Sequence, residues 1–342
     1  MITTRAPGKL YIAGEYAVVE PGHPAILVAV DRHITVTLTE SDGVGCIASS
    51  GRRTVTWHRE ADGTMVMKRH SYVTRAIEVV DRLRAERGIP PLTFDLTIDS
   101  ELEEGGRKLG LGSSAAVVVA VIEAVTELYG LGLSPIDRIK LAILATVARS
   151  PRASGGDIAA STLGGWILYR SPDRAVLARE RTVTAAMESA GWQGFDVRAL
   201  PAPTLDLMVG WTGTPASTQS LVDAVEQAGP ADFDAFLADS DRIVHSLAGA
   251  LESGDHAGVQ SAVREARQNL ARLQESTGIA IETDRLAALC DIAVAHGAAA
   301  KPSGAGGGDC GIALGTFDRG LLSEWESAGI VPLDLHVQEG AA

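Results

Sequence analysis

The sequence predicts an α+β protein whose strands and helices are partly segregated along the chain. In the first third, stretches of alternating apolar and polar residues have the period of two that is typical of strands. From residue 232 onward, apolar residues recur every three or four positions, as they do in helices. A chain of 342 residues is long enough for two domains. We expect them at residues 1–175 and 200–342, with the junction in a proline-containing stretch near residues 171–203.

The expected strands of the first half follow from their apolar patterns. Residues 24–30 form a continuous apolar run, whereas residues 32–39 and 92–99 alternate between apolar and polar side chains. Strands are predicted at residues 24–30, 32–39, 55–57, 64–67, 92–99 and 164–169.

The expected helices of the first half have recognisable ends. Residues 71–87 carry the stripe of an amphipathic helix, which Gly88 is placed to end. Residues 113–129 are apolar on nearly all sides, so a buried helix is predicted there. A third helix begins at Ser134-Pro135, because a capping residue is followed by proline in the first turn.

The second half is expected to be mainly helical, with few strands. Helices are predicted at residues 232–252, 255–276 and 283–296, and strands at residues 205–210 and 310–314 flank them.

Composition and charge exclude several classes of protein. The apolar content of 46% and the charged content of 21% are those of a globular protein. A formal charge of −13 argues against nucleic-acid or anionic-membrane partners, which require a cationic face. No apolar run is long enough to span a bilayer. The three cysteines are too widely separated for a disulfide framework or a zinc site, so we expect a cytoplasmic protein.

Three glycine-rich segments carry most of the information about function. They lie at residues 6–15, 110–116 and 303–309, and lysines accompany them in a chain that has only five. Glycine lets backbone N–H groups close around a ligand, and such clusters of N–H groups bind anions. Together, the three segments predict an enzyme that handles phosphate groups.

The second segment opens the predicted helix at residue 113. A helix N-terminus offers free N–H groups and the positive end of a dipole, which suits the phosphates of a nucleotide. Ser113 and Ser114 can cap this helix, ligate Mg²⁺, or both. The chain has no G-x-x-x-x-G-K-[ST] sequence, and the strand before residue 110 ends too early for a dinucleotide-binding turn.

Two charged side chains accompany glycines in the same way. Lys9 follows Pro7-Gly8 just before an expected strand edge, where a packed lysine needs an anionic partner. Asp157 follows Ser154-Gly155-Gly156; it can cap the next helix, or it can point into a cavity beside a lysine that keeps it ionised. The loop at residues 303–309 is expected to persist only by folding around a ligand. For the hydroxyl-rich residues 211–218, an ordinary loop and a ligand-binding loop are equally consistent with the sequence.

These segments resemble the three motifs of the GHMP small-molecule kinases, in the same order and over nearly the whole chain. Residues 6–26 are more similar still to phosphomevalonate kinases, and residues 211–218 and 301–310 also resemble that family. The resemblance implies an N-terminal domain like domain 2 of ribosomal protein S5 and a ferredoxin-like C-terminal domain. ATP and the substrate would lie in the cleft between them.

The resemblance also implies roles for individual residues. Lys9 and Asp157 would be the catalytic pair, and Ser113 and Ser114 would bind Mg²⁺. The residues implied for ATP binding are Lys108, Gly110, Leu111, Gly112, Ser113, Ser114 and Ala115. Those implied for substrate binding are Tyr16, Arg149, Ser154, Gly155, Gly156, Ser217, Lys301, Ser303, Gly304, Ala305 and Gly306.

One departure from the family pattern bears on the acceptor. Many relatives, mevalonate kinases included, have a glutamate roughly ten residues before the catalytic aspartate that helps to hold Mg²⁺. Here residues 138–156 contain no acidic residue but do contain Arg149 and Arg152. Arginines suit an acceptor that already carries a phosphate.

We therefore expect ATP-dependent phosphorylation of mevalonate 5-phosphate to mevalonate 5-diphosphate, in isoprenoid precursor synthesis. The alternatives are a mevalonate kinase, another alcohol kinase of the superfamily, or a non-catalytic ligand sensor. The expected partners are small molecules only, and the expected assembly is a monomer or a homodimer.

Overall fold

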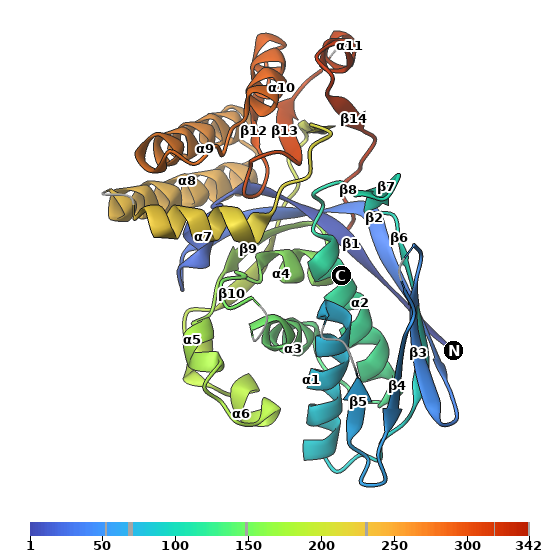
Figure 1. The fold of residues 1–342 in the computed structure, drawn as a ribbon. Coiled ribbons are helices and arrows are strands. Elements are labelled where there is room, and N and C mark those ends of the chain that lie inside the picture. Colours follow the sequence, from blue (N-terminus) through green and yellow to red (C-terminus); the bar gives the residue numbers. More distant parts are fainter. Residues whose placement is uncertain (52, 68–70, 148–149, 230–231, 318, 341–342) are drawn as a thin grey trace.

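The computed structural model describes residues 1–342 except 52, 68–70, 148–149, 230–231, 318 and 341–342. Helices and strands both occur in each half of the chain, so the predicted α+β composition is confirmed (Figure 1). The strands are β1 (Ile2–Ala13), β2 (Pro24–Glu40), β3 (Val44–Ser49), β4 (Val55–Arg59), β5 (Met65–Met67), β6 (Phe94–Ser100), β7 (Glu103–Glu104), β8 (Arg107–Lys108), β9 (Trp166–Arg170), β10 (Asp196–Leu200), β11 (Asp206–Trp211), β12 (Ala299–Pro302), β13 (Cys310–Gly315) and β14 (Val331–Leu333).

The helices follow groups of strands in the first half and dominate the second. The α-helices are α1 (Tyr72–Glu86), α2 (Ser113–Leu128), α3 (Pro135–Val147), α4 (Gly156–Leu163), α5 (Arg174–Leu177), α6 (Val183–Met187), α7 (Thr218–Ala228), α8 (Phe233–Ser253), α9 (His256–Thr277), α10 (Asp284–Ala295) and α11 (Arg319–Ser327). Two short 3₁₀ helices are η1 (Ala17–Val19) and η2 (Ala190–Trp192).

The first half is built on an eight-stranded sheet with the order β10-β9-β2-β6-β3-β4-β5, and β1 joins it by pairing with β2. At 17 residues, β2 is long enough to pair with β9 near its start, with β6 near its end and with β1 along most of its length. The register of β1 against β2 shifts between Pro7 and Gly8. Such irregularities re-aim the side chains beside them, and Lys9 is the next residue.

Helices α1–α4 pack together beside this sheet (Figure 1). α2 contacts β1 and β2 as well as the three other helices, and most of its residues are buried. Because apolar contacts surround α2, its sequence is apolar on nearly all sides, as predicted.

The second half contains the four-stranded antiparallel sheet β12-β13-β11-β14 and helices α7–α11. α9 and α10 pack on β12, while α8 also contacts β2 and β10 of the large sheet. One apolar core runs from Ala6 to Leu335 and includes side chains of both halves. The predicted boundary near residues 171–203 stays a prediction; β10 within that stretch pairs with β9.

The chain returns to the large sheet after β14. Val337 forms an isolated antiparallel bridge to Val30. The Gln338 N–H donates to the Ala29 carbonyl (3.0 Å), and the Gly165 N–H donates to the Gln338 carbonyl (2.7 Å). This C-terminal segment therefore joins strands from the first and middle parts of the chain.

Most predicted elements are present, but several others were not predicted: β1, β3, β7, β8, β10, β12, β14, α5, α6, α7 and α11. The two strands expected at residues 24–30 and 32–39 are one strand, β2. Lys9 lies inside β1 rather than before a strand edge, because β1 continues past the register shift between Pro7 and Gly8 and pairs again with β2 from Gly8 onward. α7 was not predicted from the sequence, although Leu221, Val222 and Val225 recur at helical spacing and only Val225 is fully buried.

Candidate active site

A cavity of about 460 Å³ lies where the three glycine-rich segments meet. Its wall is formed by β1, the loop before α2, the start of α4, the start of α7 and the loop after β12. The predicted site residues in this wall are Lys9, Tyr16, Lys108, Gly110, Leu111, Gly112, Ser113, Ser114, Ser154, Asp157, Ser217, Gly304 and Ala305. The fold thus brings both ends of the chain and its middle to one cavity.

Lys9 is fixed against the second glycine-rich segment. Its backbone N–H donates to the Leu111 carbonyl at 2.9 Å. Its side-chain stem crosses Gly112 so closely that a Cβ there would come within 2.8 Å of Lys9 Cε. The side chain is 8% exposed, and its ammonium lies 5.1 Å from the centre of the Tyr11 ring. An alanine at position 112 would therefore force the Lys9 side chain to shift.

Asp157 lies in the first turn of α4 but does not cap the helix. The N-cap residue is Gly155, which forms no side-chain cap, and Asp157 Oδ1 instead accepts from the Ile158 N–H at 3.0 Å. Burial raises the pKa of the Asp157 carboxyl, and the nearby Lys9 ammonium opposes this rise. Of the two readings left open by the sequence, the placement supports a carboxylate facing the cavity beside Lys9.

The second segment leaves the N-terminus of α2 uncapped. Its N-cap is Gly112 at φ +78°, without a side-chain cap, so neither serine caps the helix. Ser113 and Ser114 face the cavity, as do Gly110 and Lys108. The first N–H groups of a helix have no intrahelical acceptor, so this end presents donors to an anion.

The third segment is held by the protein itself, contrary to the expectation that it needs a ligand to persist. The Gly307 N–H donates to the Ile281 carbonyl, and the Asp309 N–H to the Thr214 carbonyl, both at 2.8 Å. A Cβ on Gly308 would approach the Thr214 oxygen to 2.4 Å, so this close contact admits only glycine.

Asp309 joins the third segment to the second. Its Oδ1 accepts from the Ala216 N–H at 3.1 Å, and a Cβ on Gly110 would come within 2.6 Å of Asp309 Cβ. Burial raises the pKa of the Asp309 carboxyl, while Lys9 and Lys108 lower it. A second carboxylate therefore faces the same lysine as Asp157.

Lys301 is placed behind the cavity rather than in its wall. Its side chain is fully buried and forms an ion pair with Glu15. Glu15 Oε1 also accepts from the Gly304 N–H at 3.4 Å. The predicted direct contact of Lys301 with substrate does not match this placement, because the Glu15 carboxylate already neutralises the ammonium. The ion pair with Glu15 is more consistent with a role for Lys301 in positioning the third segment.

Tyr16, the residue after the first segment, connects it to the third. Its hydroxyl donates to the Ala305 carbonyl at 2.6 Å. Its backbone has φ +61° and ψ −51°, and the Ala17 N–H donates to the Glu15 carbonyl at 2.7 Å across it. This is a γ-turn with positive φ, a strained form that is rare for residues other than glycine.

The remaining predicted site residues line the cavity less directly or fall outside the description. Ser303 Oγ accepts from the Tyr11 N–H (2.9 Å) and donates to the Tyr11 carbonyl (3.0 Å), so it joins β1 to the third segment. Arg149 lies outside the described residues. Those that form no part of the cavity wall are Ala115, Gly155, Gly156, Lys301, Ser303 and Gly306.

Known proteins share both halves of this arrangement. Residues 71–165 match the family model "GHMP kinases N terminal domain", and residues 247–322 match "GHMP kinases C terminal". Phosphomevalonate kinase from Streptomyces sp. (strain CL190) is 49% identical over 364 aligned residues, covering 98% of this chain and 96% of that protein.

The chain belongs to the GHMP kinase superfamily. Solved structures agree with the two-domain GHMP kinase fold that the motifs implied. Streptococcus pneumoniae phosphomevalonate kinase, in complex with phosphomevalonate and AMPPNP, matches with a TM-score of 0.85 at 32% identity, covering 100% of both chains. A Lin0012 protein from Listeria innocua matches with a TM-score of 0.91 at 34% identity, covering 99% of this chain and 98% of that one. The predicted resemblance to phosphomevalonate kinases is confirmed.

Sequence reasoning about this GHMP kinase missed several residues of the cavity. Tyr11, two positions after Lys9, bonds Ser154 Oγ through its hydroxyl at 3.0 Å. Burial raises the pKa of this hydroxyl, and the nearby Asp157 carboxylate adds to the rise. The period of two in β1 could have placed Tyr11 beside Lys9, had that strand been predicted.

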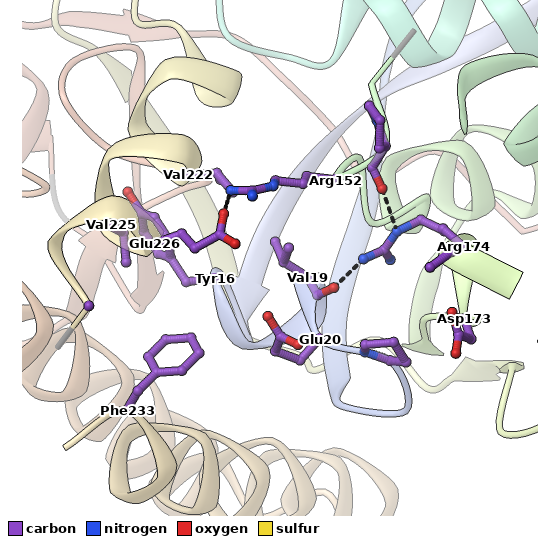
Figure 2. A pocket seen from close by; sticks show the side chains of 14 residues that line it. Tyr16, Val19, Glu20, Arg152, Asp173, Arg174, Val222, Val225, Glu226 and Phe233 are labelled. Atoms are coloured by element: carbon purple, nitrogen blue, oxygen red, sulfur yellow. Dashed lines mark hydrogen bonds and ion pairs between the residues drawn. The ribbon is translucent and has the colours of Figure 1, made fainter. Parts of the chain in front are cut away.

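A second cavity of about 400 Å³ adjoins the first in this GHMP kinase. We call it the side chamber; Tyr16, Val19, Arg152 and Val222 line both cavities. Figure 2 shows Arg152 reaching across to Glu226 of α7, and Arg174 bonded to backbone carbonyls. Apolar side chains of α7 and Phe233 complete much of its wall. Among the helices that the structure describes, none is long and apolar enough to cross a membrane.

Proposed function

We propose that this protein transfers the γ-phosphoryl group of ATP to the phosphate of phosphomevalonate. One observation carries this proposal: three glycine-rich segments converge on a cavity where Lys9 lies beside two carboxylates, in a chain 49% identical to a phosphomevalonate kinase. In the reaction, an oxygen of the acceptor phosphate attacks the γ-phosphorus. The bond from that phosphorus to the bridging oxygen of ATP breaks, and ADP leaves.

The acceptor explains the roles of Lys9 and Asp157. A phosphate monoester has a second pKa of about 6, so it is mostly dianionic at neutral pH and needs no general base. The barrier lies in bringing two polyanions together, which calls for positioning and charge neutralisation. Lys9 supplies positive charge at this place, and Asp157 orients Lys9. With an alcohol acceptor, Asp157 would be a candidate base instead.

The second glycine-rich segment suits the phosphates of ATP. The uncapped N-terminus of α2 offers backbone N–H groups, and Lys108 adds positive charge at the same wall. Ser113 and Ser114 would contribute hydroxyl oxygens to Mg²⁺, which neutralises the phosphates when it is bound. Among the described residues, no group of three His, Cys, Asp or Glu side chains could hold a metal ion. The set of ligands therefore suits Mg²⁺, which usually keeps several waters and binds substrate phosphates.

ADP release tests the proposed function. Purified protein is assayed with ATP and Mg²⁺ against mevalonate, phosphomevalonate and diphosphomevalonate. We expect ADP release with phosphomevalonate alone, together with mevalonate 5-diphosphate as the product. Release with mevalonate alone would replace the proposal by a mevalonate kinase. ATP binding without turnover on any acceptor would favour a non-catalytic sensor.

A further inference from the structure

Three basic side chains line the main cavity among the described residues: Lys9, Lys108 and Arg152. Lys9 interacts with Asp157 and Asp309 at the meeting point of the glycine-rich segments. Lys108 lies two residues before Gly110, beside the loop that suits the nucleotide. Arg152 is one of the two arginines that suit a phosphate-bearing acceptor, but no contact with the acceptor has been assigned to it so far. It lies in the loop that leads to Ser154 and Asp157, on the wall shared with the side chamber.

The Arg152 side chain is paired with carboxylates of α7. Its Nη1 lies 3.5 Å from Asp223 Oδ1 and also forms an ion pair with Glu226. The three side chains are 41%, 38% and 59% exposed, in the order Arg152, Asp223, Glu226. Ion pairs between such exposed side chains contribute little to stability, so a better anion can displace them.

The backbone beside Arg152 is held more firmly than its side chain. Arg174, which is 6% exposed, donates from Nε to the Pro151 carbonyl at 3.1 Å and from Nη2 to the Val19 carbonyl. These bonds tie the Arg152 loop to η1, which follows the first glycine-rich segment. The side chamber next to the Arg152 guanidinium leaves room for it to turn (Figure 2).

We propose that Arg152 binds the phosphate group of the acceptor, and that Asp223 and Glu226 hold its guanidinium until the acceptor arrives. The inference rests on the proposed function and names the group that selects a phosphate monoester over an alcohol. A planar guanidinium binds phosphate through two parallel hydrogen bonds, and a dianion attracts it more strongly than an exposed carboxylate. Only an exchange of ionic partners is involved; no bond is made or broken.

A structural role for Arg152 makes a different prediction. If Arg152 only tethered α7, removing the arginine and removing its two carboxylates would break the same tether. Acceptor binding would then change in the same direction in both cases. If the carboxylates compete with the acceptor for Arg152, removing them strengthens acceptor binding, whereas removing the arginine weakens it. The two roles therefore differ in the sign of the effect.

The test compares Arg152→Gln with the double variant Asp223→Asn/Glu226→Gln by steady-state kinetics. Arg152→Gln is expected to raise KM for phosphomevalonate about ten- to a hundredfold, because a hydrogen bond to a charged group is lost. KM for ATP is expected to stay unchanged. The double variant is expected to lower KM for phosphomevalonate by up to about fivefold. Arg152→Lys keeps the positive charge but loses the paired N–H donors of the guanidinium. Its KM for phosphomevalonate is expected to lie between those of Arg152→Gln and wild type.

Arg198→Gln is the matched control, because Arg198 forms a similarly exposed ion pair with Glu252 away from the cavity. Its KM for phosphomevalonate is expected to equal that of wild type. An unchanged KM in Arg152→Gln, or a rise in KM in both Arg152→Gln and the double variant, overturns the inference while wild-type turnover stands. If wild-type protein releases no ADP with phosphomevalonate, the proposed function fails, and this inference fails with it.

Discussion

Lys9 occupies an unusual electrostatic position because acidic side chains approach it from both halves of the chain. Burial raises the pKa of both Asp157 and Asp309, and the Lys9 ammonium opposes the rise in each case. Two partly desolvated carboxylates thus share one lysine. When polyanionic substrates enter, the lysine can contact the transferred phosphoryl group while the carboxylates fix its direction.

Asp157→Asn tests whether this carboxylate is a base or an orienting charge. With phosphomevalonate as acceptor, we expect kcat to fall by no more than about tenfold, because a dianionic acceptor has no proton to give up. Lys9→Met, the comparison variant, is expected to lose about a thousandfold in kcat, as for other groups that stabilise developing charge. Steady-state kinetics of both variants measures kcat. A loss of about a thousandfold in kcat for Asp157→Asn would favour the base role.

The same variant has a predictable effect on stability. The folded-state pKa of Asp157 is raised, so the ionised carboxylate costs stability above that pKa, and the cost disappears as the pH falls below the ordinary carboxyl value of about 4. Asparagine carries no charge at any pH. Asp157→Asn should therefore have a Tm above wild type at pH 7.5, and the difference should shrink toward pH 4 in calorimetric scans.

Sequence motifs could place Lys9 and Asp157 together at a cavity but could not predict the pairing of Lys301. A lysine beside a glycine-rich loop looks like a phosphate ligand, whereas its true surroundings depend on Glu15, 286 positions away. Nothing local to residue 301 indicates that a carboxylate will be buried against it. The same holds for Arg152, whose partners on α7 belong to a helix that was itself not predicted.

At the scale of elements, the glycines act by letting separate segments approach one another. The stem of Lys9 packs closely against Gly112, Asp309 against Gly110, and the Thr214 carbonyl against Gly308. Each contact joins a loop to an element distant in sequence. The glycine-rich segments thus serve the assembly of the site as well as the binding of anions, which was the role inferred from their sequence.

Gly112→Ala tests the close contact between Gly112 and the Lys9 side chain. The added Cβ meets Lys9 Cε at 2.8 Å, so the lysine must move, and we expect kcat to fall about a hundredfold, as small misplacements of reacting groups do. Gly132→Ala is the control: Gly132 also has a positive φ, +59°, but a Cβ there meets nothing within 4 Å. Both variants carry a backbone cost of about 1 to 2 kcal/mol. Equal kcat values in the two variants would contradict the proposed contact.

Element prediction succeeded where the apolar pattern of a segment is clear, and failed where other residues obscure it. The apolar helix at residues 113–129 and the alternating strand at residues 92–99 are both present as α2 and β6. β1 was missed because Pro7, Gly8 and Lys9 obscure its pattern, although it is mostly buried. Long-range pairing with β2 supplies the stability that the local sequence does not indicate.

At the scale of the whole molecule, the two halves share a large apolar core with members from Ala6 to Leu335, and two smaller apolar clusters of the described residues are separate from it. We therefore expect a single cooperative unfolding transition in scanning calorimetry, with equal calorimetric and van't Hoff enthalpies. Two resolved transitions would show instead that the predicted domains, 1–175 and 200–342, unfold independently.

The C-terminal segment that bridges to β2 has a consequence for how the protein is made. His336 donates its backbone N–H to Asp31, a partner 305 residues earlier in the chain. At a translation rate of about 5 to 20 residues per second, roughly 15 to 60 s pass between the synthesis of these two residues. During that interval residues 29–31 lack their hydrogen bonds to the C-terminal segment, although Ala29 and Val30 can already pair with Lys9 and Gly8 of β1. Water occupies the groups that await the C-terminal segment.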